Sequence, residues 1–209
     1  MAFCISRYGW LRSDAGDRHR PDAVTVHVDR EIVALRGFVE DGAGFGREDV
    51  RLLLKREGQV VARYAKRELP NYQVFDERRY FTPGEQPCVF EVQGVRVGLL
   101  VCEDAWFEQP ARETRAAGAQ LLAVINASPF HIGKGGEREH TMADRVRDCG
   151  LPLVYAHLVG GQDEIVFEGR SFVLGADGSL AGRAISFEES RFDIAFSRVG
   201  DGWSVEAET

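Results

Sequence analysis

Two strand pairs follow from the pattern of hydrophobic and polar positions after residue 50. The segments "VRLLLKR" (50–56) and "QVVARYA" (59–65) are short, rich in branched and aromatic residues, and separated by a Glu-Gly pair, which predicts a hairpin. The segment "CVFEVQGVRVGLLVC" (88–102) predicts a second hairpin with its turn near Gly94. Its second strand is almost entirely apolar, which is typical of a strand buried on both faces of a sheet.

Helical segments alternate with further strands in the second half of the chain. "EQPARETRAAGA" (108–119) predicts a helix, with proline near its start and glycine near its end, and "GEREHTMADRVRDCG" (136–150) predicts another. Buried strands are predicted at "LLAVIN" (121–126) and "LVYAHLV" (153–159), and a hairpin at "SFVLGADGSLAGRAISF" (171–187). This order predicts an α/β layered fold with a mixed sheet.

The chain divides into three parts by pattern. Residues 50–195 carry the periodic segments and form the predicted domain. Residues 1–49 are an atypical N-terminal segment, rich in Arg, Asp and Gly, with strand candidates only at "AVTVHV" (23–28) and "EIVALRGFV" (31–39). We interpret this segment as misread or disordered. The tail "FSRVGDGWSVEAET" (196–209) is interpreted as a terminal linker.

Composition narrows the class of protein. The chain has 209 residues, of which 44% are hydrophobic, which suits a globular domain, and a net charge of -7, which argues against a nucleic-acid partner. No apolar run reaches the ~18 residues of a membrane span, and the N-terminus has no signal-peptide pattern. The four cysteines form no CxxC pair and no zinc-type cluster, so we predict no metal site and a reducing, cytoplasmic setting.

The candidate nucleophile lies in "LLVCEDAWF" (99–107), where an apolar strand ends abruptly in Cys102 and two acids. A residue at a sharp strand-to-helix turn is exposed, as in a nucleophile elbow. A thiol there attacks a carbonyl or nitrile carbon when a base removes its proton and donors hold the oxyanion. A cysteine at a strand end is also typical of an inert, buried small residue.

A second unusual stretch is "AKRELPNYQVFDERRYFTPG" (65–84). It is dense in charges, aromatic residues and proline, so it predicts a loop that supports a site. Lys66 directly follows a predicted strand, which would position its amine. Taken alone, Lys66 is more typical of an ordinary surface lysine than of a positioned amine.

Four motifs together carry a family resemblance: "YAKRELPNYQVFDERRYFTPG", "GVRVGLLVCEDAWF", "NASPFHIGK" and "VYAHLVGGQDEIVFEGRSFVL". In this order and spacing they resemble the nitrilase-like (carbon–nitrogen hydrolase) glutaminase domain of bacterial glutamine-dependent NAD+ synthetases, over residues 50–195. The resemblance implies an α/β fold, the nitrilase-like αββα sandwich, with an incomplete N-terminal part. It also implies glutamine hydrolysis through a cysteine thioester, with the released ammonia used to convert deamido-NAD+ into NAD+.

The resemblance also implies roles for individual residues. The catalytic residues would be the nucleophile Cys102, the triad lysine Lys66 and the supporting acid Glu77. Contacts to glutamine would come from Tyr72, Ser128 and Lys134. Each contact residue also has an ordinary interpretation: aromatic packing for the tyrosine, a turn cap for the serine and a solvated charge for the lysine.

The sequence departs from the family pattern in three places. The motif that holds the triad glutamate does not occur in residues 1–49, and we assign its role to neither Glu31 nor Glu40. His157 stands where the family pattern has asparagine, and a lone histidine beside an apolar strand is usually a satisfied core residue. No S-G-G-x-D-S pyrophosphate loop follows the domain, so we expect ATP and magnesium to belong to a separate synthetase domain and no cofactor in this chain.

Three functions therefore stay open at this point. The first is a glutaminase that supplies ammonia to an NAD+ synthetase domain as its partner, impaired by the absent glutamate motif. The second is a stand-alone amidohydrolase of the nitrilase superfamily. The third is a non-catalytic subunit that keeps only interaction surfaces. Self-association into a homo-oligomer is implied by the resemblance, and no membrane partner is expected.

Overall fold

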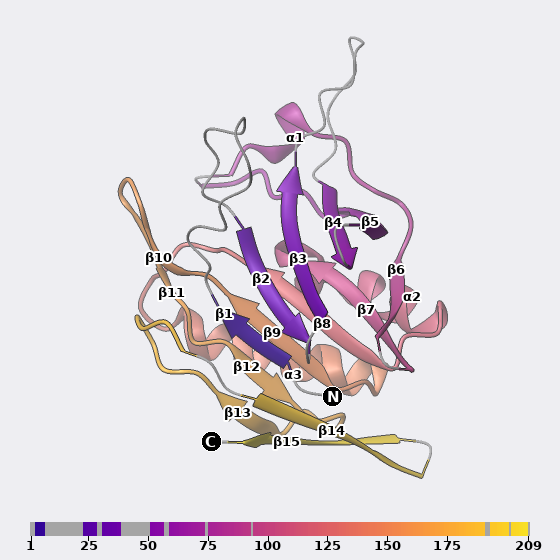
Figure 1. The fold of residues 1–209 in the computed structure, drawn as a ribbon. Coiled ribbons are helices and arrows are strands. Elements are labelled where there is room, and N and C mark those ends of the chain that lie inside the picture. The colour runs from indigo at the N-terminus through magenta and orange to yellow at the C-terminus, as the bar shows by residue number, and fades with distance from the viewer. Residues whose placement is uncertain are drawn as a thin grey trace.

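The computed structural model describes residues 3–6, 23–28, 31–38, 51–56, 59–73, 75–92, 94–190, 193–200 and 202–208. Its first sheet is antiparallel and runs in chain order through Phe3–Ser6 (β1), Ala23–Val28 (β2), Glu31–Phe38 (β3), Arg51–Arg56 (β4) and Gln59–Ala65 (β5) (Figure 1). Both N-terminal strand candidates and the β4–β5 hairpin are confirmed, whereas β1 was not predicted.

A six-stranded mixed sheet forms the centre of the molecule, in the order β13-β12-β9-β8-β7-β6. Its strands are Cys88–Val92 (β6), Val95–Val101 (β7), Leu121–Asn126 (β8), Leu153–His157 (β9), Phe172–Leu174 (β12) and Leu180–Arg183 (β13). The pairs β7–β8 and β8–β9 are parallel, while β6 and β12 pair antiparallel to their neighbours. The predicted mixed sheet is confirmed.

The helices lie on one face of this sheet (Figure 1). They are Glu108–Ala116 (α2) and Lys134–Cys149 (α3), and a 3-10 turn, Cys102–Trp106 (η1), connects β7 to α2. A further short helix, Glu77–Tyr80 (α1), lies in the loop after β5. No helix in the described ranges is long and apolar enough to cross a membrane.

Alternating side chains of β7, β8 and β9 fill two cores. Leu100, Leu122 and Tyr155 pack with Met142 and Val146 of α3. On the opposite face Leu99, Leu121 and Val154 pack with Tyr64 of β5 and with the C-terminal strands. The layers are therefore helix, sheet and sheet, which agrees with a nitrilase-like sandwich and explains why these strands are apolar on both faces.

The C-terminal tail is a strand pair, Asp193–Val199 (β14) and Gly202–Glu208 (β15), where a linker was expected from residue 196. Ile194 and Phe196 are buried, and Trp203 and Val205 pack against the same core. Apolar residues thus alternate along both strands, which lets one face of the hairpin cover the sheet. The tail is short and carries several charged residues, so this alternation was not recognised in the sequence.

The hairpin of Val159–Gln162 (β10) and Ile165–Glu168 (β11) projects at the edge of the molecule (Figure 1). It holds the "VGGQDE" segment, and the strand predicted over 153–159 therefore ends at His157. The amide of Phe130 donates to the Val166 carbonyl at 2.7 Å. This contact attaches the loop after β8 to the hairpin.

Gly98 of β7 lies where a larger side chain should destabilise the fold. A Cβ at this position would collide with the side chains of Thr114 and Ala119, where α2 approaches the sheet. Because Thr114 is buried and donates to the Pro110 carbonyl at 2.7 Å, it has little room to move. We expect Gly98→Ala to lower the free energy of unfolding by about 1–3 kcal/mol in urea titration.

The matched control is Gly136→Ala in α3, where a Cβ meets nothing within 4 Å. Alanine is the better helix former, so this variant should be unchanged or more stable by up to about 1 kcal/mol. Equal unfolding midpoints for the two variants would contradict the proposed close contact.

Candidate active site

Three polar side chains follow one another along the edge formed by the parallel strands. Cys102 comes directly after β7, Asn126 ends β8 and His157 ends β9. Asn126 pairs in register with His157, and Val101 pairs with Ile125 one position earlier. Carboxyl ends of parallel strands form the usual binding edge of an α/β sheet. The register therefore brings the thiol, the amide and the imidazole to one edge.

Cys102 lies at the sharp turn between β7 and η1. Its φ is 50°, in the left-handed region that residues with a side chain rarely adopt, and its side chain is partly buried. Strain of this kind typically costs about 1–3 kcal/mol and persists where the surroundings impose it. This is the geometry of a nucleophile elbow, as the sequence predicted.

Asp104 is the residue that fixes this turn. It is completely buried and accepts four hydrogen bonds: from the amides of Val101, Arg67 and Glu68 at 3.0, 3.0 and 2.7 Å, and from the Tyr64 hydroxyl at 2.8 Å. Burial raises the pKa of Asp104, while these four donors lower it. Asp104 thus ties the nucleophile turn to the start of the Lys66 loop and has no lone pair directed at a substrate.

Lys66 and Glu77 form an ion pair beside the thiol. The Lys66 Nζ lies 2.7 Å from both carboxylate oxygens of Glu77, and the lysine is 3% exposed. The loop that carries both residues closes on itself, because the Gly84 amide donates to the Lys66 carbonyl at 2.8 Å. A Cβ at Gly84 would overlap the backbone of Ala65, so glycine permits this closure. Two of the residues that the resemblance places in the site, Lys66 and Glu77, are thus in direct contact.

The electrostatics of Cys102 combine burial with this ion pair. The pKa of the Cys102 thiol is raised to about 11, because burial and the neighbouring carboxylates raise it by more than the Lys66 ammonium lowers it. Burial also raises the pKa of Glu77, against the lowering effect of Lys66. At neutral pH the resting thiol therefore keeps its proton, and reaction requires a base that removes it.

Tyr72 and Lys134 lie at the rim around the turn. The Tyr72 hydroxyl, half exposed, donates to both oxygens of Glu103 at 2.9 Å, directly beside the nucleophile. The Lys134 Nζ lies 4.2 Å from the ring centroid of Trp106, the last residue of η1, and 3.1 Å from Glu137. Cation–π contact thus holds the lysine near the η1 turn.

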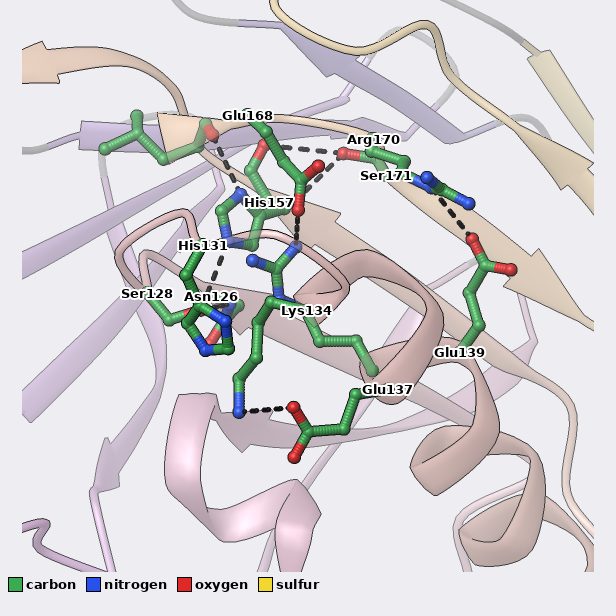
Figure 2. Close-up of polar contacts among 12 residues, drawn as sticks. Asn126, Ser128, His131, Lys134, Glu137, Glu139, His157, Glu168, Arg170 and Ser171 are labelled. Atoms are coloured by element: carbon green, nitrogen blue, oxygen red, sulfur yellow. Dashed lines mark hydrogen bonds and ion pairs between the residues drawn. The ribbon is translucent and has the colours of Figure 1, made fainter. Parts of the chain in front are cut away.

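Ser128 belongs to a chain of hydrogen bonds between the ends of β8 and β9 (Figure 2). Its Oγ lies 3.0 Å from Asn126 Nδ2 and 3.4 Å from His157 Nε2. His157 Nδ1 lies 2.8 Å from the Leu158 carbonyl. Burial, reinforced by the nearby Arg138 guanidinium, lowers the pKa of His157 to about 3, so the imidazole is neutral.

A buried ion pair supports this chain from α3. Arg138 Nη1 lies 2.8 Å from the Glu168 carboxylate, and both side chains are almost fully buried. On the next residue of α3, Glu139 binds Arg170 and Arg183. These contacts join the helix to the end of β11 and to β13, and so hold the segment after His157 in place.

Asp104 and its sequence neighbour provide a matched test of the turn. Asp104→Asn places an amide N–H against donors in a buried site, so we expect unfolding to become easier by about 2–4 kcal/mol in urea titration. Glu103→Gln removes a charge whose partner is the half-exposed Tyr72, and should change stability by less than about 0.5 kcal/mol. If both variants lost the same stability, Asp104 would not be the residue that fixes the turn.

The structure brings the six predicted site residues into three local groups around η1 and the strand ends. Lys66 pairs with Glu77, and Tyr72 contacts the residue after Cys102. Ser128 lies on the loop after β8, and Lys134 begins α3 at the end of that loop. Sequence reasoning missed Asn126, whereas His157 is buried and hydrogen-bonded, as expected of a satisfied core residue. The sequence feature that marks both residues is a polar side chain at the end of each of two successive apolar strands.

Nowhere in the described ranges do three or more His, Cys, Asp or Glu side chains form a metal-binding group.

Comparison with known proteins agrees with this geometry. The family model described as "Carbon-nitrogen hydrolase" matches residues 33–201. The glutamine-dependent NAD(+) synthetase of Xanthomonas campestris pv. campestris is 45% identical over 160 residues, which are 76% of this chain and 29% of that protein. The chain therefore spans under a third of the length of this relative.

Two solved structures are similar over most of the chain. Glutamine-dependent NAD+ synthetase from Acinetobacter baumannii matches with a TM-score of 0.73 and 36% identity, over 78% of this chain and 31% of that one. An amidase variant from Nesterenkonia sp. AN1, described with covalent addition at the active site cysteine, matches with a TM-score of 0.62 and 31% identity, over 69% of this chain and 54% of that one. With an elbow cysteine beside a buried lysine and acid, the chain belongs to the carbon–nitrogen hydrolase family and is similar to one part of the glutamine-dependent NAD+ synthetases.

Proposed function

We propose that this chain hydrolyses the side-chain amide of glutamine through a thioester on Cys102. The observation that carries the proposal is the strained Cys102 turn beside the Lys66–Glu77 ion pair. A left-handed elbow exposes a nucleophile, and a buried ammonium beside it favours developing negative charge. Similarity to the NAD+ synthetases and to the amidase supports the same reaction class.

The reaction begins with removal of the Cys102 proton by a carboxylate. The thiolate sulfur then forms a bond to the amide carbon, and the carbonyl oxygen becomes an oxyanion stabilised by Lys66 and nearby backbone amides. Collapse of this intermediate breaks the carbon–nitrogen bond, and the nitrogen leaves as ammonia after taking up the proton. Water then attacks the thioester carbon, which releases glutamate and returns the proton to the sulfur.

Glu77 is the described carboxylate that we assign to this machinery. Its pKa is raised, which makes it a better proton acceptor, and it maintains the charge and position of Lys66. Asp104 is saturated by four donors, and Glu103 accepts the Tyr72 hydroxyl. Of these three acids, Glu77 is therefore the one that is paired with Lys66, the lysine that would stabilise the oxyanion.

The ammonia, in this proposal, serves NAD+ synthesis on a synthetase domain in the cytoplasm. ATP and magnesium belong to that partner's reaction. The alternative is a stand-alone amidase, which is favoured by the similarity to the Nesterenkonia enzyme. The two differ in substrate: a glutaminase prefers glutamine, whereas the alternative accepts simple amides such as butyramide at least as well.

The deciding experiment is covalent labelling of the full chain with a diazoketone analogue of glutamine. We expect mass to be added at Cys102, with protection by glutamine and none by butyramide. Protection by butyramide alone would favour the amidase. No label on folded protein would exclude catalysis and favour a non-catalytic subunit. Ammonia release should then be measured with and without a separately supplied synthetase domain.

A further inference from the structure

Arg67, the residue directly after Lys66, is bound at two places by the segment that follows the nucleophile. Its backbone amide donates to Asp104 Oδ1 at 3.0 Å. Its side chain reaches α2, where the guanidinium Nη2 donates to a carboxylate oxygen of Glu113. Asp104 belongs to η1 and Glu113 to α2, and only Phe107 separates these two elements. One continuous stretch of chain therefore binds both the backbone and the side chain of a single residue.

These two contacts close a ring beside the nucleophile turn. Asp104 lies two residues after Cys102, and Arg67 lies one residue after Lys66. The ring runs from Asp104 along η1 and α2 to Glu113, across to the guanidinium, and back through the Arg67 amide. Helical backbone joins the two acceptors over most of this length, so the distance between them is fixed. The ring therefore also fixes where the Lys66 backbone lies relative to the thiol.

Burial distinguishes the Arg67–Glu113 pair from an ordinary surface pair on the same helix. The Arg67 side chain is 10% exposed, whereas Arg112 and Glu108, which pair at 3.0 Å, are 57% and 52% exposed. Arg67 Nη1 is buried and has no hydrogen-bond partner among the described residues. An unpaired buried donor costs stability, so another contact must keep the side chain in this position. The ion pair with Glu113 is that contact.

Glu113 is a well-defined acceptor for this guanidinium. Gln109, one turn earlier in α2, donates from Nε2 to the other carboxylate oxygen of Glu113 at 2.7 Å. This hydrogen bond and the Arg67 side chain lower the pKa of Glu113, so the carboxylate is ionised at neutral pH. Hydrogen bonds between charged groups are shorter and stronger than those between neutral groups. The acceptor thus has a fixed orientation as well as a charge.

We propose that Arg67 is a positioning residue, which holds the Lys66 ammonium in place relative to the Cys102 thiol by binding Glu113 of α2. The inference rests on the proposed function, because it concerns the same thiol and lysine. Arg67 acts through the adjacent lysine and makes no contact with the reacting atoms. A shift of about 1 Å in a reacting group, caused by a change outside the reacting atoms, lowers rates by up to about 10²-fold.

The first test removes the guanidinium and measures kcat and KM separately on the full chain. Arg67→Met keeps a buried apolar stem and the backbone amide. We expect kcat for ammonia release to fall about 10–100-fold while KM changes less than about threefold, because glutamine still binds and the lysine is displaced. Arg112→Met breaks the exposed pair on α2 and, as the matched control, should leave both constants unchanged. A parental kcat in Arg67→Met overturns the proposal.

A double-mutant cycle tests whether the two side chains act through one contact. Glu113→Ala lies at a partly exposed helix position, where alanine is a good helix former, and should lower kcat as much as Arg67→Met does. The double variant should lose no more than either single variant, since the contact is broken only once. Arg67→Lys, which keeps a cation, should lie closer to the parent than Arg67→Met. Losses that multiply in the double variant reject the pair.

Alkylation of the nucleophile reports the position of the lysine without turnover. The titratable groups that face the thiol are Lys66, Tyr72, Glu77, Glu103, Asp104 and Tyr155. The Lys66 ammonium is the group among them that lowers the pKa of Cys102, so its displacement should raise this pKa and reduce the thiolate fraction. We expect iodoacetamide to modify Cys102 at least about threefold more slowly in Arg67→Met at about pH 8, measured by mass at this residue.

This measurement separates the positioning role from the reaction. Slower alkylation in Arg67→Met, with no glutamine hydrolysis by the parent, rejects the reaction and supports the positioning role. Hydrolysis by the parent, with alkylation in Arg67→Met as fast as in Arg112→Met, rejects the positioning role and leaves the reaction in place.

Discussion

Replacing Cys102 with alanine should lower the rate of glutamine hydrolysis by about 10⁴-fold or more, because in the proposed mechanism the sulfur forms the covalent intermediate and alanine has no atom that can carry out the attack. Stability should remain close to that of the parent, since the thiol is only partly buried and alanine keeps the same φ of 50°. The measurement is ammonia release in a coupled assay, with thermal unfolding recorded on the same sample.

Cys149→Ala is the matched control for this variant. Cys149 is also a free cysteine, but it is buried at the end of α3, within the helix-side core. This substitution should cost about 1 kcal/mol of stability and leave the rate per folded molecule unchanged. Retained hydrolysis in Cys102→Ala would reject the thioester mechanism.

Lys66→Met should lower hydrolysis by about 10²–10⁴-fold, in the range expected when an oxyanion or proton-transfer partner is lost. Methionine keeps the length of the side chain but removes the ammonium that lies 2.7 Å from both Glu77 oxygens. The variant should also unfold more easily, because Glu77 is left partly buried without its cation.

The double variant Lys66→Met with Glu77→Gln separates these two effects. A neutral pair removes the unpaired charge, so stability should return toward the parent value while activity stays low. Recovery of activity in the double variant would show that the lysine acts only by holding the fold. Urea titration and ammonia release on matched samples are sufficient to decide.

The sequence predicted the central sheet well for a physical reason. Strands β7, β8 and β9 are buried on both faces, so their apolar runs are continuous, and the helices between them end at glycines. The prediction was wrong for β14–β15, where each strand contributes two apolar side chains to the core, with one small residue, Ala195 or Ser204, between them. Short edge elements depend on contacts that a linear pattern does not contain.

The residue types of the candidate site could be predicted from the sequence, but the contacts between these residues could not. Cys102 was signalled by an abrupt end to an apolar run, and Lys66 by a charged loop after a strand. The linkage of Lys66 to Glu77 spans eleven positions across an irregular loop, and that of Ser128 to His157 spans twenty-nine. Asp104 was noted only as one of two acids after Cys102, and three of its four donors lie in residues 64–68, more than thirty positions away in the sequence.

The closure of the loop between Lys66 and Gly84 has a consequence for how this enzyme class diversifies. The loop leaves and rejoins the scaffold at one point, where the Gly84 amide meets the Lys66 carbonyl at 2.8 Å. We expect the interior of this loop, including Tyr72, to tolerate exchange as long as the closing contact and the amide hydrogen bonds of Arg67 and Glu68 to Asp104 are kept. The nucleophile and the imidazole sit on strand ends that such an exchange leaves untouched. New amide specificities should therefore be accessible by grafting foreign residues between Arg67 and Pro83 that retain an acid opposite the lysine.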